Sequence, residues 1–66
     1  MQIVLNGESR EVADDITLDA LIGMLDMPTR RFAIEVNEEL IPRSEHAGHT
    51  LHADDRIEVV QAIGGG

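Results

Sequence analysis

The chain has 66 residues and a formal net charge of −8, because thirteen acidic residues stand against five basic ones, all of them arginine. A chain of this length forms one small domain with little room for a deep active site, and its acidic surface disfavours nucleic-acid binding. The absence of cysteine excludes disulfides, thiolate metal sites and a cysteine nucleophile. No apolar run is long enough to span a bilayer and no leader-like segment precedes the first strand, so we expect a cytoplasmic protein without a membrane partner.

The opening stretch, MQIVLNGESREV, predicts a β-hairpin. Two segments of strand-like sequence, residues 2–5 and 8–12, flank Asn6-Gly7. Both turn residues tolerate the positive φ that a type I′ turn requires, and this turn matches the twist of the strands that it joins.

The next stretch, ITLDALIGMLDMP, changes to a helical period. Its large aliphatic residues recur at i, i+3, i+4 and i+7 and form one stripe: Leu18, Leu21, Ile22 and Leu25. Thr17 suits the N-cap position, and Pro28 ends the pattern. We expect one amphipathic helix over residues 18–26, with Gly23 as its weakest position.

The stretch RRFAIEVNEELIP returns to a period of two, which places Phe32, Ile34 and Val36 on one face of a strand. Residues 37–39 predict a turn. A short strand, Leu40-Ile41, follows and stops at Pro42, because proline cannot donate to a ladder.

The remainder of the chain predicts one more strand. Residues 43–55 are irregular, with one helical turn after Ser44, and the last strand runs from Arg56 to about Ala62. The order of elements indicates an α+β roll: one main helix packed on a mixed sheet of four or five strands. We expect a domain over residues 1–63 and a flexible glycine tail over residues 64–66.

The apolar positions of these elements predict the core. One face of the sheet and the helix stripe should bury the following residues: Ile3, Leu5, Val12, Ile16, Leu18, Leu21, Ile22, Leu25, Phe32 or Ile34 with Val36, Leu40, Leu51, Ile57 and Val59.

The sequence predicts no catalytic or metal site. The acid pairs, at residues 14–15, 38–39 and 54–55, fall in predicted turns, where solvation accounts for them, and no glycine-rich loop precedes the helix. Histidines recur every three residues at His46, His49 and His52, but a structural zinc site requires four ligands and no matching ligand occurs elsewhere. We interpret them as surface histidines of a loop.

The last three residues, Gly64, Gly65 and Gly66, raise a different possibility. An extended segment without side chains is the narrowest peptide that can enter a channel of another protein, and its terminal carboxylate is unhindered. A carboxylate becomes a good electrophile only after activation, for example as an acyl-adenylate. The alternative is a frayed end without function.

Four stretches, MQIVLNG, TLDALIGMLD, AIEVNEELIPR and DDRIEVVQAIGGG, together resemble the ubiquitin-like β-grasp proteins and, among them, the sulfur carriers of the MoaD/ThiS family, especially the ThiS branch that serves thiamin (thiazole) biosynthesis. The resemblance implies a sheet in which the first and last strands lie side by side and parallel, with the helix behind. It implies a carrier rather than an enzyme, with no bound cofactor.

The resemblance also implies a role for each glycine and a set of partners. A ThiF-like adenylyltransferase would use ATP and magnesium to adenylate the Gly66 carboxylate, and a persulfide donor would convert it to a thiocarboxylate. A ThiG-like thiazole synthase would accept the sulfur. Gly64, Gly65 and Gly66 would thread into the partner, although the family pattern needs only the last two. Sulfur carriage for molybdopterin or cysteine synthesis and a non-carrier β-grasp binding module remain alternatives.

Strand alternation predicts a partner-binding surface. If Ile3 and Ile57 face the helix, their neighbours in sequence face away. We expect partner contacts at Val4, Glu58, Val60, Ala62 and Ile63, with Val4 and Val60 as neighbours. Acidic residues beside them, Glu35 and Glu58, would complement a basic partner.

Overall fold

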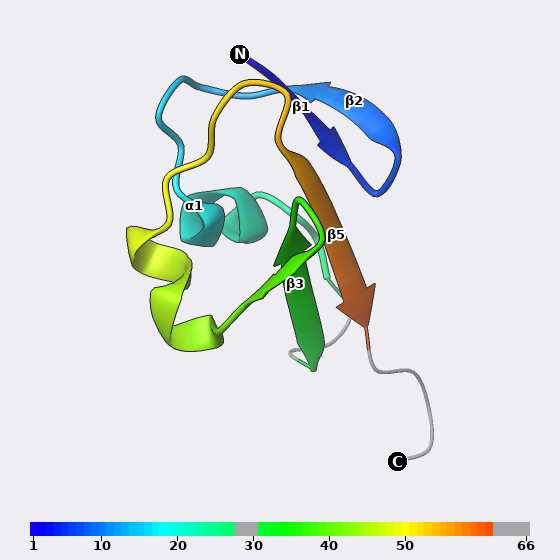
Figure 1. The fold of residues 1–66 in the computed structure, drawn as a ribbon, viewed down its shortest axis with the longest axis vertical. Helices are drawn as coiled ribbons and strands as arrows, with labels where there is room; N and C mark the ends of the chain where they lie inside the picture. Colours follow the sequence, from blue (N-terminus) through cyan, green and yellow to red (C-terminus); the bar gives the residue numbers. More distant parts are fainter. Residues whose placement is uncertain (28–30, 62–66) are drawn as a thin grey trace.

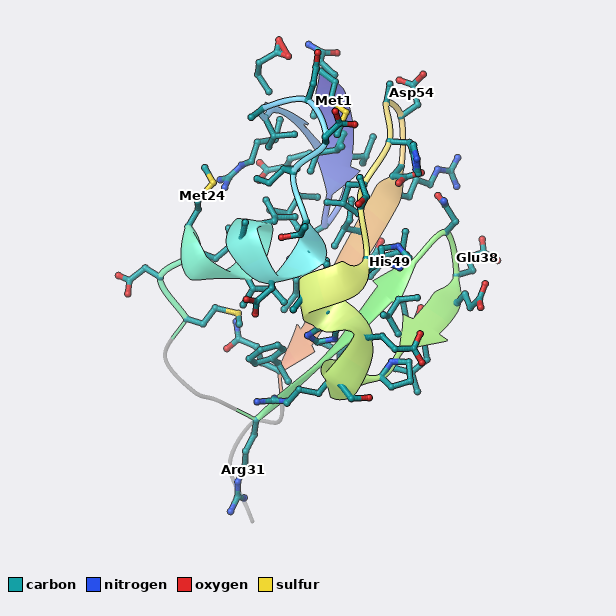
Figure 2. All side chains as sticks on the ribbon, turned by 90° about the vertical axis from the view of Figure 1, so that its left-hand side faces the viewer. Met1, Met24, Arg31, Glu38, His49 and Asp54 are labelled. Carbon is teal, nitrogen blue, oxygen red and sulfur yellow. The ribbon has the colours of Figure 1, made fainter. Side chains whose placement is uncertain are left out.

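A single mixed sheet organises the computed structural model, which describes residues 1–27 and 31–61. Its strand order is β2-β1-β5-β3-β4. The elements in chain order are β1 (Gln2–Leu5), β2 (Glu8–Glu11), α1 (Leu18–Gly23), β3 (Phe32–Val36), β4 (Glu39–Ile41), the 3-10 helix η1 (Arg43–Gly48) and β5 (Arg56–Gln61). Helices α1 and η1 pack against each other and cover one face of the sheet (Figures 1 and 2). The predicted α+β roll is confirmed.

Strand β5 lies at the centre of the sheet. It runs parallel to β1, with Leu5 opposite Ile57, and antiparallel to β3, with Val36 opposite the same Ile57 (Figure 1). The first and last strands therefore lie side by side and parallel, as the resemblance implied.

The first hairpin forms as predicted. Strands β1 and β2 pair from Gln2–Glu11 to Leu5–Glu8, and the turn residues Asn6 and Gly7 have φ angles of 49° and 82°. Strand β2 ends one residue earlier than predicted. Val12 nevertheless stays in the core, because its N–H donates to the Met1 carbonyl at 2.8 Å.

Helix α1 begins where the sequence indicates. The side-chain oxygen of Thr17 accepts a hydrogen bond from the N–H of Ala20 at 3.2 Å, which satisfies one of the free donors of the first turn. Leu18 and Leu21, the first two residues of the predicted stripe, are fully buried.

The end of α1 corrects the prediction. The helix stops at Gly23 rather than at residue 26. The N–H groups of Met24 and Leu25 bond to carbonyls three residues back, which closes the helix with a tighter 3-10 turn. The apolar stripe continues to Leu25, but glycine favours a helix too weakly to support another turn. Pro28, the predicted stop, lies outside the described residues.

The turn between β3 and β4 has two residues and not three. Asn37 and Glu38 both adopt positive φ, at 53° and 69°, and Glu39 already belongs to β4. This register places Ile41 opposite Ile34 in the core and Leu40 opposite Glu35 on the outer face of the sheet. The prediction that Leu40 belongs to the core is wrong: its exposed fraction is 61%.

The core otherwise follows the predicted pattern. The buried apolar residues are Ile3, Leu5, Val12, Leu18, Leu21, Ile34, Val36, Ile41, Leu51 and Ile57. Half-buried residues pack around them, namely Met1, Ile16, Ile22, Leu25, Phe32 and Val59. Within the described ranges, no helix has the length and apolar character needed to cross a membrane.

The 3-10 helix η1 corrects the expectation for the histidines. His46, predicted to lie on the surface, is only 5% exposed, whereas His49 is half-buried and His52 is exposed. The His46 Nε2–H donates to the Ile41 carbonyl at 3.0 Å, which removes the cost of burying that group. The imidazole ring also stacks on Phe32, with ring centroids 6.5 Å apart and an interplanar angle of 18°.

Candidate functional site: the end of strand β5

The predicted site lies on β5 and on the residues that follow it, with one further residue, Val4, on β1. The structure describes Val4, Glu58 and Val60, which belong to the predicted partner surface. The other predicted site residues lie outside the described residues: Ala62, Ile63, Gly64, Gly65 and Gly66.

The start of β5 is fixed by the side chain of Asn37, in the β3–β4 turn, and by that of Asp55, just before β5. The Asn37 side chain accepts a hydrogen bond from the Arg56 N–H at 3.0 Å and donates one to the Asp55 carboxylate at 3.0 Å. The Asn37 N–H in turn donates to the Arg56 carbonyl at 2.7 Å. The other Asp55 oxygen accepts from the His52 N–H at 2.8 Å. A side-chain network thus fixes the position at which β5 enters the sheet.

Asn6 extends the contact between β1 and β5 beyond the last residue of β1. Its N–H donates to the Ile57 carbonyl at 2.9 Å, and its side-chain oxygen accepts from the Val59 N–H at 2.8 Å. The side chain therefore takes the place of a backbone carbonyl one step further along β5. This restrains β5 close to its last described residue, Gln61.

Strand β3 supports the other edge of β5 as far as Gln61, which pairs with Phe32. Phe32 is itself held by two side chains from η1. His46 stacks on it, and the guanidinium carbon of Arg43 lies 4.6 Å from its ring centroid. The residues after Gln61 therefore leave from a fixed point of the fold.

The outer face of the sheet carries the described part of the predicted partner surface. Glu58 and Val60 are exposed, and Val60 has 56% of its surface accessible; Val4 is half-buried. The expectation that Val4 and Val60 are neighbours is wrong. Val4 lies opposite Arg56, so Val60 is four residues further along β5, or about 13 Å at the rise of a strand.

The actual neighbours of Glu58 and Val60 come from β3, and β4 adds the next residue of the row. Glu58 pairs with Glu35, Val60 pairs with Ala33, and Glu35 also pairs with Leu40. Leu40 is the surface residue that the sequence reasoning missed. The signal was the two-residue turn: once Val36 pairs with Glu39, Leu40 must share the face of Glu35.

In the described parts of the chain, no group of three or more histidine, aspartate or glutamate side chains is placed to hold a metal ion. The histidines lie in different environments. His46 is buried in the core, whereas His52 is at the surface, with its Nδ1 3.9 Å from the Asp55 carboxylate. The candidate site therefore consists of the end of β5, which hydrogen bonds hold in place, and the exposed outer face of the sheet.

Comparison with known proteins gives the family. A model described as the ThiS family matches residues 3–66. The chain belongs to the ThiS family. Among its relatives, the sulfur carrier protein ThiS of Escherichia coli is 32% identical over 66 residues, which is the whole length of both chains.

A solved structure confirms the β-grasp fold of this ThiS-family chain. The thiamine biosynthesis protein (ThiS) of Geobacter metallireducens matches it with a TM-score of 0.87 and 25% identity, over 100% of each chain. A thiazole synthase of Paramagnetospirillum magneticum is 39% identical over 66 residues. That match covers all of this chain but only 20% of the thiazole synthase, so this chain spans about a fifth of that relative's length.

Proposed function

We propose that this protein is a sulfur carrier for the thiazole of thiamin, and that the carboxylate of Gly66 is its reacting group. The observation that carries the proposal is the match to the ThiS family over residues 3–66, on a fold whose central strand ends just before the glycines. The full-length similarity to the sulfur carrier of Escherichia coli supports the same function.

The proposed chemistry has three steps. A carboxylate oxygen of Gly66 attacks the α-phosphorus of ATP, with magnesium bound to the phosphates, and pyrophosphate leaves. The terminal sulfur of a persulfide then attacks the acyl carbon, AMP leaves, and an acyl disulfide forms. A thiol attacks the donor-side sulfur of this disulfide, which releases the thiocarboxylate and leaves a disulfide between the donor and the thiol.

In this proposal the carrier is a co-substrate and not an enzyme. It has no cysteine, so both the persulfide and the reducing thiol belong to other molecules. Its own contribution is to present an acyl carbon that two enzymes can reach from opposite sides, which glycine permits because it has no side chain. We place this chemistry in the cytoplasm, with a domain over residues 1–63 and a flexible tail over residues 64–66.

The proposed partners are a ThiF-like adenylyltransferase, a persulfide donor and a ThiG-like thiazole synthase. The similarity to part of a thiazole synthase supports the third, because it indicates that a domain of this kind also occurs in one chain with that enzyme. The same similarity favours thiazole formation over molybdopterin or cysteine synthesis. We further propose that Val4, Glu58, Val60, Ala62 and Ile63 contact these partners.

Deletion of Gly66 tests the proposed reacting group. The shortened protein should still fold and bind the adenylyltransferase through the sheet, but the enzyme should no longer convert it to a thiocarboxylate, because the new terminus lies one residue short of the ATP site. Gly48→Ala is the control and should retain modification, because Gly48 lies in η1 and a β-carbon built there meets no heavy atom within 4 Å. If the protein without Gly66 is converted to a thiocarboxylate at the normal rate, Gly66 is not the required reacting group. If the unaltered protein binds the adenylyltransferase but is never converted, the carrier proposal is wrong and the binding-module alternative gains support.

A further inference from the structure

Three neighbouring strands place a continuous row of side chains on the outer face of the sheet. Leu40 of β4 lies opposite Glu35 of β3, and Glu35 lies opposite Glu58 of β5. Val60 lies two residues after Glu58 on β5, opposite Ala33 of β3. We call these five residues the outer patch. It lies on the face opposite to α1 and η1 and extends to the end of β5.

The two carboxylates of the outer patch have no evident structural purpose. Directly opposed residues of an antiparallel pair have Cβ atoms about 4.5–5.5 Å apart, and like charges at this distance destabilise a sheet. The ion pairs found among the described residues join the Met1 ammonium to Glu11 and Asp14, and His52 to Asp55. None of them neutralises Glu35 or Glu58.

The apolar members of the patch frame the carboxylates. Leu40 and Val60 have exposed fractions of 61% and 56%, and they are two of the three most exposed large apolar residues of the described chain. Exposed apolar side chains with polar residues around them mark protein–protein interaction sites. A ligand that fits must bring positive charge to the centre and apolar groups to both sides.

We propose that the outer patch binds a partner protein through one arginine seated between Glu35 and Glu58, with apolar side chains of the partner over Leu40 and Val60. A guanidinium is planar and has five donors, so it can bond to two adjacent carboxylates at once, whereas an ammonium acts as a point charge. Binding would replace the repulsion between the carboxylates with two charge-assisted contacts. The proposal rests on the proposed function, because it assigns the partner to the adenylyltransferase that would modify Gly66.

The test is the carrier-dependent exchange of pyrophosphate into ATP by a ThiF-like adenylyltransferase. Glu35→Gln and Glu58→Gln should each raise the KM for the carrier about fivefold and leave kcat unchanged, because they weaken docking and not the chemistry at Gly66. Val60→Asp should raise the KM as well. The KM of the unaltered protein should rise with salt, and that of the double glutamine variant should rise less.

Two controls separate docking from folding. Glu45→Gln makes the same change of charge on η1, on the opposite face, and should leave the KM unchanged. The midpoint of urea unfolding should stay the same or rise in Glu58→Gln, since the opposed like charges are removed.

The outcomes are distinguishable. Exchange with the unaltered protein but equal KM values for Glu35→Gln, Glu58→Gln and Glu45→Gln would overturn the outer patch and leave the carrier function standing. No exchange with the unaltered protein would overturn both proposals.

Discussion

Asn6 shows how one residue can serve both a turn and the neighbouring strand. Its φ of 49° is one that asparagine tolerates better than most residues, and its side-chain oxygen bonds to the Val59 N–H at 2.8 Å. The sequence motif Asn-Gly predicts the positive φ of the turn. The hydrogen bond to Val59 depends on the pairing of β1 with β5, which are far apart in the sequence.

We predict that Asn6→Ala lowers the free energy of unfolding by about 1–3 kcal/mol, because it loses a hydrogen bond and places a β-carbon at positive φ. Urea denaturation followed by circular dichroism measures this. Asn6→Gly, which keeps the conformational freedom but loses the hydrogen bond, should fall between alanine and the unaltered protein. Equal stability of all three proteins would show that the Asn6–Val59 bond contributes nothing.

The Met1 ammonium is the titrating group for which we predict a pH effect. It donates to the Asp14 carboxylate at 3.1 Å and lies 3.2 Å from Glu11. The hydrogen bond to Asp14, and after it the one to Glu11, raise the pKa of the ammonium above its ordinary value of 8.0. A raised pKa means that the folded state binds the proton more tightly, so the stabilisation is complete below pH 8.0 and is lost as the pH rises through the folded-state pKa.

The urea concentration at the midpoint of unfolding should therefore decrease as the pH rises above 8.0 and through the raised pKa of the amine. Asp14→Asn should reduce the size of this fall, because it removes the principal cause of the shift. An undiminished fall in Asp14→Asn would assign the pH dependence to another group.

At the scale of elements, the sequence predicts existence and type better than ends and registers. Local signals determined the first hairpin and the start of α1, since Asn6-Gly7 and Thr17 act within a few residues. The predicted end of α1 is wrong because the apolar stripe continues to Leu25, whereas the α-helix ends at Gly23 and only 3-10 hydrogen bonds follow. Leu40 was misplaced because an adjacent pair of apolar residues in a strand can point only one member inward, and the turn length decides which one.

Gly23 is an element-scale opportunity for stabilisation. A β-carbon built at this position meets no heavy atom within 4 Å, and glycine costs more entropy to order than alanine. Gly23→Ala should raise the free energy of unfolding by about 0.4–1 kcal/mol, measured by urea denaturation. The KM of the ThiF-like adenylyltransferase for the carrier should not change. Destabilisation would mean that the end of α1 requires the freedom of glycine.

At the scale of the whole molecule, local periodicity could not supply the topology. The parallel pairing of β1 and β5 joins the two ends of the chain, and it followed from the resemblance to the β-grasp proteins rather than from any local pattern. The same is true of the site: composition shows that no internal sulfur nucleophile exists, while the role of Gly66 rests on the family. His46 illustrates the limit, because only the folded chain brings Ile41 and Phe32 around its ring.

Different parts of the molecule stabilise the central strand and present the binding surface, as expected for a carrier. The helical layer and the core stabilise a central strand, side chains from two turns fix the start and the end of that strand, and the opposite face presents the outer patch. Binding at the patch and reaction at the tail would thus use separate parts of a domain whose last strand connects them.

Intact mass spectrometry tests the central claim most directly. The protein is incubated with ATP, magnesium, a ThiF-like adenylyltransferase, a persulfide donor and a thiol, and its mass is compared with that of a sample without ATP. We predict the exchange of one oxygen for one sulfur, located at Gly66 by fragmentation. An unchanged mass, under conditions in which the same enzymes modify the sulfur carrier of Escherichia coli, would contradict the account.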